Sequence, residues 1–158
     1  MQKEEQYKEL ALSLDSLLRD SPSEVSLLAN ASAMLFQTLP SLNWAGFYLL
    51  DEEGSSLILG PFQGKVACQV LRVGKGVCGT AIQEDRILSV GDVHSFSGHI
   101  ACDPDSRSEI VLPLYKNGKP YGVLDIDSPI LNRFDTFDEQ GLLKIAEVIN
   151  ANLSRFEK

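Results

Sequence analysis

Residues 109–127 read EIVLPLYKNGKPYGVLDID, in which two apolar runs flank an Asn-Gly pair. Each run has the length of a strand, and Asn-Gly between two such runs is a strong signal for a tight β-hairpin. The pattern predicts strands from Glu109 to Tyr115 and from Tyr121 to Asp127, joined through Asn117 and Gly118. We therefore expect an antiparallel sheet that contains this hairpin.

The second strand of the hairpin carries two carboxylates at alternate positions. Alternation places Asp125 and Asp127 on one face and Leu124 and Ile126 on the other. At a separation of about 7 Å, two carboxylates on a half-buried surface repel each other and raise at least one pKa. Solvent-exposed charges are the alternative, but the apolar neighbours and the low strand propensity of aspartate favour a binding role. Glu109, which opens the neighbouring strand, could join them across the ladder.

Another strand pattern runs from Trp44 to Leu50. Its alternation places Trp44, Gly46 and Tyr48 on one face, which would leave a slot between two aromatic walls. Ordinary core packing of the two rings is the alternative.

Helical patterns lie on either side of the strands. Apolar spacing predicts a helix from Lys3 to Leu18. Residues 21–24 (Ser-Pro-Ser-Glu) predict the start of a second helix, with Ser21 as its cap, that stops before Pro40. In the last helix, Thr136 is the expected cap and Glu139 its partner. The apolar stripe of one of the two N-terminal helices could contact another subunit instead of the core.

The order of elements predicts the fold class. Shorter strand patterns at 57–59, 70–73 and 86–90, and a short helical pattern at 77–83, complete the middle of the chain. Helices, then strands, then a helix are typical of an α+β architecture with an antiparallel sheet and helices on one side. The length of 158 residues predicts a single domain over residues 1–158.

A cysteine lies beside a dense turn signal. Residues 103–106 (Asp-Pro-Asp-Ser) cannot form a helix interior or a central strand, so Cys102 should lie at the mouth of a loop. There the thiol could be partly exposed and close to His99 and Arg107, whose positive charge would favour the thiolate. A small apolar residue that ends a strand is the alternative. Combined with the carboxylates and aromatic rings, Cys102 suggests a pocket for a small, partly cationic, partly apolar ligand.

Composition excludes several functions. The hydrophobic share of 44% and the charged share of 23% are ordinary for a soluble globular protein, and a net charge of −8 argues against nucleic acid as partner. The chain has neither an apolar run of membrane-spanning length nor a secretory signal, so we expect a cytoplasmic protein that does not contact membranes.

The odd number of cysteines argues against a disulfide framework, and favours free, catalytic or metal-bound thiols. A zinc site is not predicted, because no short Cys-x2–4-Cys spacing occurs among the candidate ligands Cys68, Cys78, His94, His99 and Cys102. Gly74-Lys75-Gly76 lacks the remaining residues of a phosphate-binding loop.

Five motifs in fixed order, together with the Trp44-x3-Tyr48 strand, resemble the free methionine-(R)-sulfoxide reductases, which are stand-alone GAF-fold enzymes. They are GPFQGK (60–65), GVCG (76–79), GHIACD (98–103), SRSEIV (106–111) and GVLDIDS (122–128). The resemblance covers roughly residues 44 to 138. Val66, Lys75 and Ser97 depart from the expected proline, arginine and proline, but none of these changes removes a reactive group.

The resemblance implies a GAF-like sheet with ligand-pocket loops opposite the helices. It also implies a thiol-dependent oxidoreductase that acts on free methionine-(R)-sulfoxide and not on protein-bound residues. Glu109, Asp125 and Asp127 would hold the ammonium group of the substrate, and Trp44 and Tyr48 would clasp its methyl group. Because the family is commonly dimeric, the N-terminal helices are a candidate homodimer surface.

The implied chemistry begins with attack of the Cys102 thiolate on the sulfoxide sulfur. A carboxylic acid of raised pKa, Glu109 or one of the aspartates, would protonate the departing oxygen. Cys102 would become a sulfenic acid, which Cys68 or Cys78 would condense to a disulfide. Thioredoxin, with electrons that come from NADPH, would reduce the disulfide and restore the thiols. No bound cofactor is expected.

Alternatives remain at two levels. Cys78 could gain thiolate character at a helix N-terminus and attack in place of Cys102. A non-enzymatic GAF sensor of a small metabolite or of redox state is the alternative to the reductase, and a zinc-dependent hydrolase is a third possibility.

Overall fold

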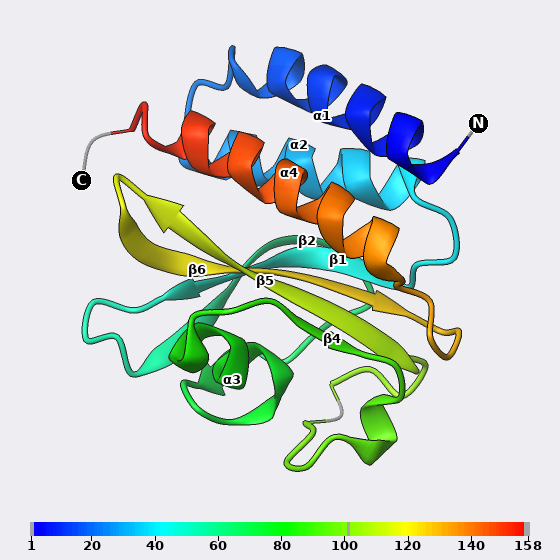
Figure 1. The fold of residues 1–158 in the computed structure, drawn as a ribbon. Helices are drawn as coiled ribbons and strands as arrows, with labels where there is room; N and C mark the ends of the chain where they lie inside the picture. The colour runs from blue at the N-terminus through cyan, green and yellow to red at the C-terminus, as the bar shows by residue number, and fades with distance from the viewer. Residues whose placement is uncertain (1, 101, 157–158) are drawn as a thin grey trace.

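The computed structural model describes residues 2–100 and 102–156, and within them six strands form a curled antiparallel sheet (Figure 1). The strand order is β3-β2-β1-β6-β5-β4. The strands are β1 (Trp44–Leu50), β2 (Ser56–Gly64), β3 (Val70–Arg72), β4 (Leu88–Val90), β5 (Ser108–Lys116) and β6 (Lys119–Ser128). The predicted antiparallel sheet is confirmed.

The β5–β6 hairpin has the predicted turn. Asn117 and Gly118 both have positive φ, 53° and 78°, as the tight hairpin turn requires. The strands extend slightly beyond the predicted limits, and their register pairs Glu109 with Asp127 and Val111 with Asp125. Directly opposed side chains in such a pair lie about 5 Å apart, so the register brings the Glu109 carboxylate to those of β6.

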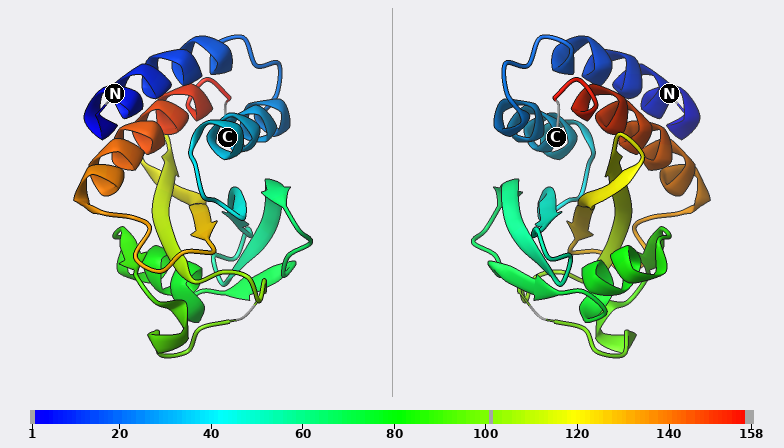
Figure 2. Two further views of the ribbon diagram at one scale, coloured as in Figure 1. Left: turned by 90° about the vertical axis from the view of Figure 1, so that its right-hand side faces the viewer. Right: turned by 90° about the vertical axis from the view of Figure 1, so that its left-hand side faces the viewer.

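Helices α1 (Lys3–Leu18), α2 (Glu24–Thr38) and α4 (Thr136–Leu153) cover one face of the sheet (Figure 2). The short helix α3 (Gly76–Glu84), the 3-10 turn η1 (Val93–Ser95) and the long loops lie on the opposite side (Figures 1 and 2). The predicted α+β architecture, with the N-terminal and C-terminal helices on one side, is therefore confirmed. No helix in the described part of the chain is long and apolar enough to cross a membrane.

Two predicted helix caps are wrong by one or two positions. Ser23 caps α2 in place of Ser21, and its hydroxyl accepts a hydrogen bond from the Ser26 amide at 3.1 Å. Asp135 caps α4 in place of Thr136 and forms a reciprocal capping box with Asp138. Neighbouring serine, threonine and aspartate residues are all good caps, so propensity alone does not select among them.

The two faces of the sheet differ in what they bury. On the helix face, side chains such as Ala45, Phe47, Leu124 and Ile126 join the apolar core beneath α1, α2 and α4. On the pocket face, the alternate residues Trp44, Tyr48, Asp125 and Asp127 point away from the helices and line a cavity. The period-two pattern of β1 and β6 therefore separates the main core from a site of different chemistry.

Candidate functional site

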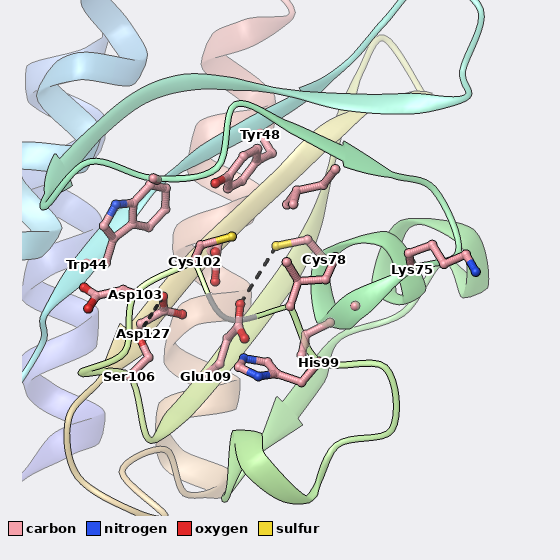
Figure 3. Close-up of a pocket in the computed structure, with 16 residues that line it drawn as sticks. Trp44, Tyr48, Lys75, Cys78, His99, Cys102, Asp103, Ser106, Glu109 and Asp127 are labelled. Carbon is pink, nitrogen blue, oxygen red and sulfur yellow. Dashed lines mark hydrogen bonds between the residues drawn. The ribbon is translucent and has the colours of Figure 1, made fainter.

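A pocket on the pocket face gathers most of the predicted site residues (Figure 3). Strands β1, β5 and β6 form one side, α3 contributes another, and the loop before β5 closes it. The predicted residues that line it are Trp44, Tyr48, Cys78, Cys102, Glu109, Asp125 and Asp127. Cys68 is not a lining residue but is bonded to Cys102.

The two aromatic side chains form one wall of the pocket. The Trp44 and Tyr48 rings stack with centroids 5.8 Å apart, and the Phe62 ring stacks on Trp44 at 5.1 Å. The predicted slot between Trp44 and Tyr48 is therefore wrong, because the rings contact each other. Gly46 is required for this packing, since a Cβ there would lie 2.2 Å from the Cβ of Phe62.

Both rings also hold the loop that carries Cys68. The Trp44 indole N–H donates a hydrogen bond to the Lys65 carbonyl oxygen at 3.2 Å. The Tyr48 hydroxyl donates to the carbonyl oxygen of Cys68 at 2.9 Å. Residues expected only to contact a ligand thus also fix the position of one sulfur.

Cys68 and Cys102 form a disulfide, although they are 34 residues apart in sequence. Both are half-buried, and Cys102 borders the pocket (Figure 3). The sequence left Cys68 and Cys78 open as partners of Cys102, and Cys68 is the one to which it is joined. The pair is a cross-link between two loops.

Cys78 is a buried free thiol in the first turn of α3. Its Sγ donates a hydrogen bond to Glu109 Oε2 at 3.9 Å (Figure 3). Burial raises the pKa of the Cys78 thiol well above its usual value, and the charges of Asp125 and Glu109 raise it further. Burial and the neighbouring carboxylates therefore act against the thiolate character that the helix N-terminus would give Cys78.

The carboxylates of Glu109, Asp125 and Asp127 form the acidic part of the pocket. Burial raises the pKa of Asp125 and of Asp127 well above the usual range, and repulsion within the cluster adds to it. The predicted rise is confirmed. Oδ1 of Asp125 and Oδ1 of Asp127 are buried without a hydrogen-bond partner, and the salt bridges among residues 2–100 and 102–156 include none of the three. Such a pocket is suited to a cationic ligand group.

Comparison with known proteins gives a family for this site. The GAF domain model matches residues 14–153. The free methionine-R-sulfoxide reductase of Escherichia coli is 50% identical over 145 residues, which cover 92% of this chain and 87% of that protein. The enzyme of the same name from Saccharomyces cerevisiae is 46% identical over 156 residues, with coverage of 95% and 87%. This chain belongs to the free methionine-R-sulfoxide reductase family.

A solved member of this reductase family has the same fold. The structure of free methionine-R-sulfoxide reductase from Neisseria meningitidis, in complex with its substrate, superposes with a TM-score of 0.92 at 39% identity. The match covers 98% of this chain and 93% of that one. The family and the GAF-like fold predicted from the sequence motifs are therefore confirmed.

In this reductase-family chain, a polar network that the sequence did not predict fastens the Cys102 loop to the sheet. The Asn43 side-chain amide donates to Asp103 Oδ2 and to Ser106 Oγ, both at 3.0 Å. The Ser106 hydroxyl in turn donates to Asp127 Oδ2 at 3.3 Å (Figure 3). Asn43 directly precedes β1, and neither its type nor its spacing signals this role.

The charged neighbours predicted for Cys102 are only partly present. His99 lines the pocket, whereas Arg107 is exposed and is not among the lining residues. Of the positions that depart from the reductase motifs, Val66 and Ser97 are exposed. The ammonium group of Lys75 points away from the carboxylates (Figure 3).

Proposed function

We propose that this protein reduces free L-methionine-(R)-sulfoxide to methionine, with Cys102 as nucleophile and Cys68 as resolving thiol. The observation that carries the proposal is the Cys68–Cys102 disulfide at the edge of a buried acidic pocket. A disulfide in this position is the oxidised product expected after one turnover of a two-thiol reductase.

Substrate binding follows from the two halves of the pocket. Glu109, Asp125 and Asp127 accept the substrate ammonium group, since none of the three is held in a salt bridge within the described residues. The aromatic wall of Trp44 and Tyr48 contacts the methyl group on sulfur and favours one stereoisomer. A peptide-bound methionine sulfoxide has no free ammonium group, so it is a poor ligand.

The first step transfers oxygen from the substrate to Cys102. The Cys102 thiolate attacks the sulfoxide sulfur, while a carboxylic acid of the pocket protonates the sulfoxide oxygen. Asp125 and Asp127 are suited to donate because burial raises the pKa of each well above its usual value and so favours the protonated acid. Glu109, beside Asp127 in the hairpin register, is the third candidate donor. The hydroxyl group then moves from the substrate sulfur to Cys102 Sγ as the new S–S bond breaks, so methionine leaves and Cys102 is left as a sulfenic acid.

The second step closes the disulfide and releases water. The Cys68 thiol attacks the Cys102 sulfenic acid, and its sulfur replaces the hydroxyl group. A thioredoxin-type dithiol then exchanges with the disulfide and restores both thiols, with NADPH as the ultimate electron source. This sequence needs no bound cofactor, and it leaves Cys78 outside the electron path.

Single-turnover chemistry tests the assignment. Fully reduced protein is mixed with excess methionine-(R)-sulfoxide, without recycling, and the methionine formed per chain is counted. In this assay we expect no methionine from Cys102→Ser, and about one methionine per chain from Cys68→Ser, which should leave a trappable sulfenic acid. In a separate assay with the thioredoxin system, Cys78→Ser should consume NADPH continuously. Loss of the single turnover in Cys78→Ser alone would show that the nucleophile is misassigned. Stoichiometric ligand binding with no NADPH consumption would favour the sensor.

A further inference from the structure

The thiol that catalysis does not use belongs to a buried three-residue cluster. Cys78 on α3, Glu109 on β5 and Asp125 on β6 each place a sulfur or oxygen atom within 4.8 Å of the others. Their exposed fractions are 4%, 8% and 5%. Helix α3 and both strands of the β5–β6 hairpin thus converge on one point of the pocket.

The donor types and spacing suit a metal ion. Zinc binds thiolate sulfur at about 2.3 Å and carboxylate oxygen at about 2.0–2.2 Å, so two donors on one ion lie roughly 3.5 Å apart. The 3.9 Å distance from Cys78 Sγ to Glu109 Oε2 needs only a small side-chain adjustment to reach this value. A mixed sulfur and oxygen set favours a borderline-soft divalent cation over magnesium or calcium.

A second observation points into the same cluster. Asp125 Oδ1 is buried without a hydrogen-bond partner, and Asp125 lines the pocket. The pocket includes Lys75, but its ammonium group points away from Glu109 and Cys78 (Figure 3). Buried acceptor atoms of this kind are costly unless a cation or a donor satisfies them.

We propose that Cys78, Glu109 and Asp125 form a binding site for a zinc-class divalent cation, which reversibly inhibits the enzyme. Coordination replaces the proton of the Cys78 thiol, which passes to solvent, and leaves a further coordination position for water. Because Glu109 and Asp125 also accept the substrate ammonium group, cation and substrate compete. The inhibitory part of this inference rests on the proposed function, whereas the binding part does not.

The disulfide form isolates the site for a binding test. With Cys68 and Cys102 joined, Cys78 is the remaining thiol of the three cysteines in the chain, so any thiolate signal belongs to it. Titration of this form with Co²⁺ should give a near-ultraviolet thiolate-to-cobalt charge-transfer band that saturates at one equivalent. Cys78→Ser should abolish the band, and Glu109→Gln should weaken binding at least about tenfold. His99→Gln, which changes a pocket residue outside the cluster, should retain it.

Turnover tests the inhibitory part. Zn²⁺ should raise the apparent KM of the wild-type enzyme for methionine sulfoxide, and a chelator should reverse the effect. Cys78→Ser should keep basal turnover and need at least about tenfold more Zn²⁺ for the same inhibition. Equal inhibition of both proteins would overturn the inhibitory part and indicate that zinc acts on Cys68 and Cys102.

The two proposals fail separately. No cobalt band in the folded disulfide form, or a band that persists in Cys78→Ser, overturns the metal site whatever the activity. A normal band in a protein that makes no methionine when metal-free would retain the site and overturn the proposed function. Thermal melts of each variant establish that loss of the band does not result from unfolding.

Discussion

The two faces of the sheet are built from the same strands, but their side chains have different surroundings. On β6, Leu124 and Ile126 are fully buried against α1, α2 and α4. Asp125 and Asp127 alternate with them and face the pocket, where each has an oxygen atom without a partner. The side chains of the helix face are buried against helices of the same chain. Under the proposed function, the ammonium group of the substrate satisfies these oxygen atoms of the pocket face.

Two buried aspartates make the difference concrete. Asp138 is 1% exposed, yet it accepts hydrogen bonds from the Tyr7 hydroxyl and the Lys3 ammonium group, both at 2.7 Å, and lies 3.2 Å from the guanidinium of Arg133. Asp125 is 5% exposed and has an unpartnered oxygen. Burial alone therefore does not mark a binding residue. The additional feature that supports the proposed binding role of Asp125 is a buried carboxylate oxygen without a hydrogen-bond partner.

The strongest test of the helix face is Leu114→Ala. Leu114 is fully buried in the core beneath the helices, on β5 but five residues beyond Glu109. Loss of its side chain should lower the free energy of unfolding by about 3 kcal/mol, because a cavity remains in a packed core. Urea unfolding measures this, and kcat of the folded fraction should change little.

Leu143→Ala is the matched control for that test. Leu143 lies on α4 and is 44% exposed, so its truncation should change the unfolding free energy by less than about 0.5 kcal/mol. A loss of comparable size in both variants would contradict the division between the core and the outer helix surface.

A smaller loss is expected at the satisfied aspartate. Asp138→Asn removes the negative charge that pairs with Lys3 and Arg133 while it retains the size of the side chain. The unfolding free energy should fall by about 2 kcal/mol, because the half-buried Arg133 guanidinium loses its ion-pair partner. Denaturant unfolding in low salt measures the change. Unaltered stability would mean that the remaining hydrogen bonds suffice.

Sequence periodicity predicts what is local in this fold. The Asn117-Gly118 turn and the alternation of β6 follow from backbone geometry within a few residues, so the hairpin and the common face of Asp125 and Asp127 are predictable. The helix from Lys3 to Leu18 follows from its apolar spacing in the same way. The caps of α2 and α4 were misplaced because several neighbouring residues have the same capping chemistry.

Features that depend on long-range contact were not predictable from spacing. Nothing in the sequence pattern selects Cys68 over Cys78 as the partner of Cys102, because the choice depends on how the loop after β2 packs on Trp44 and Tyr48. The same holds for Asn43, whose partners lie 60 and 63 residues away. The resemblance to the family indicates which residues form the site. Which residues they contact depends on side-chain packing, which only the structure shows.

Asp125→Asn should have the opposite sign to Asp138→Asn. It removes a buried carboxyl group whose ionised form has no cationic partner among the described residues, so at a pH high enough to ionise Asp125 the metal-free variant should be more stable than the wild type by on the order of 1 kcal/mol. The folded-state pKa of Asp125 is raised, so its contribution to stability is fully present below the unfolded-state pKa of about 3.9 and is lost as pH rises through the folded-state value. The advantage of the variant over the wild type should therefore grow from acid to neutral pH.

Turnover of Asp125→Asn should meanwhile fall at least about 100-fold, because a proton donor and an ammonium ligand are both lost. Unfolding curves at several pH values, recorded with a chelator, measure the stability. If Asp125→Asn is instead less stable than the wild type, Asp125 is a structural carboxylate like Asp138. The polar groups of the pocket face would then be satisfied by the chain itself, as those of the helix face are.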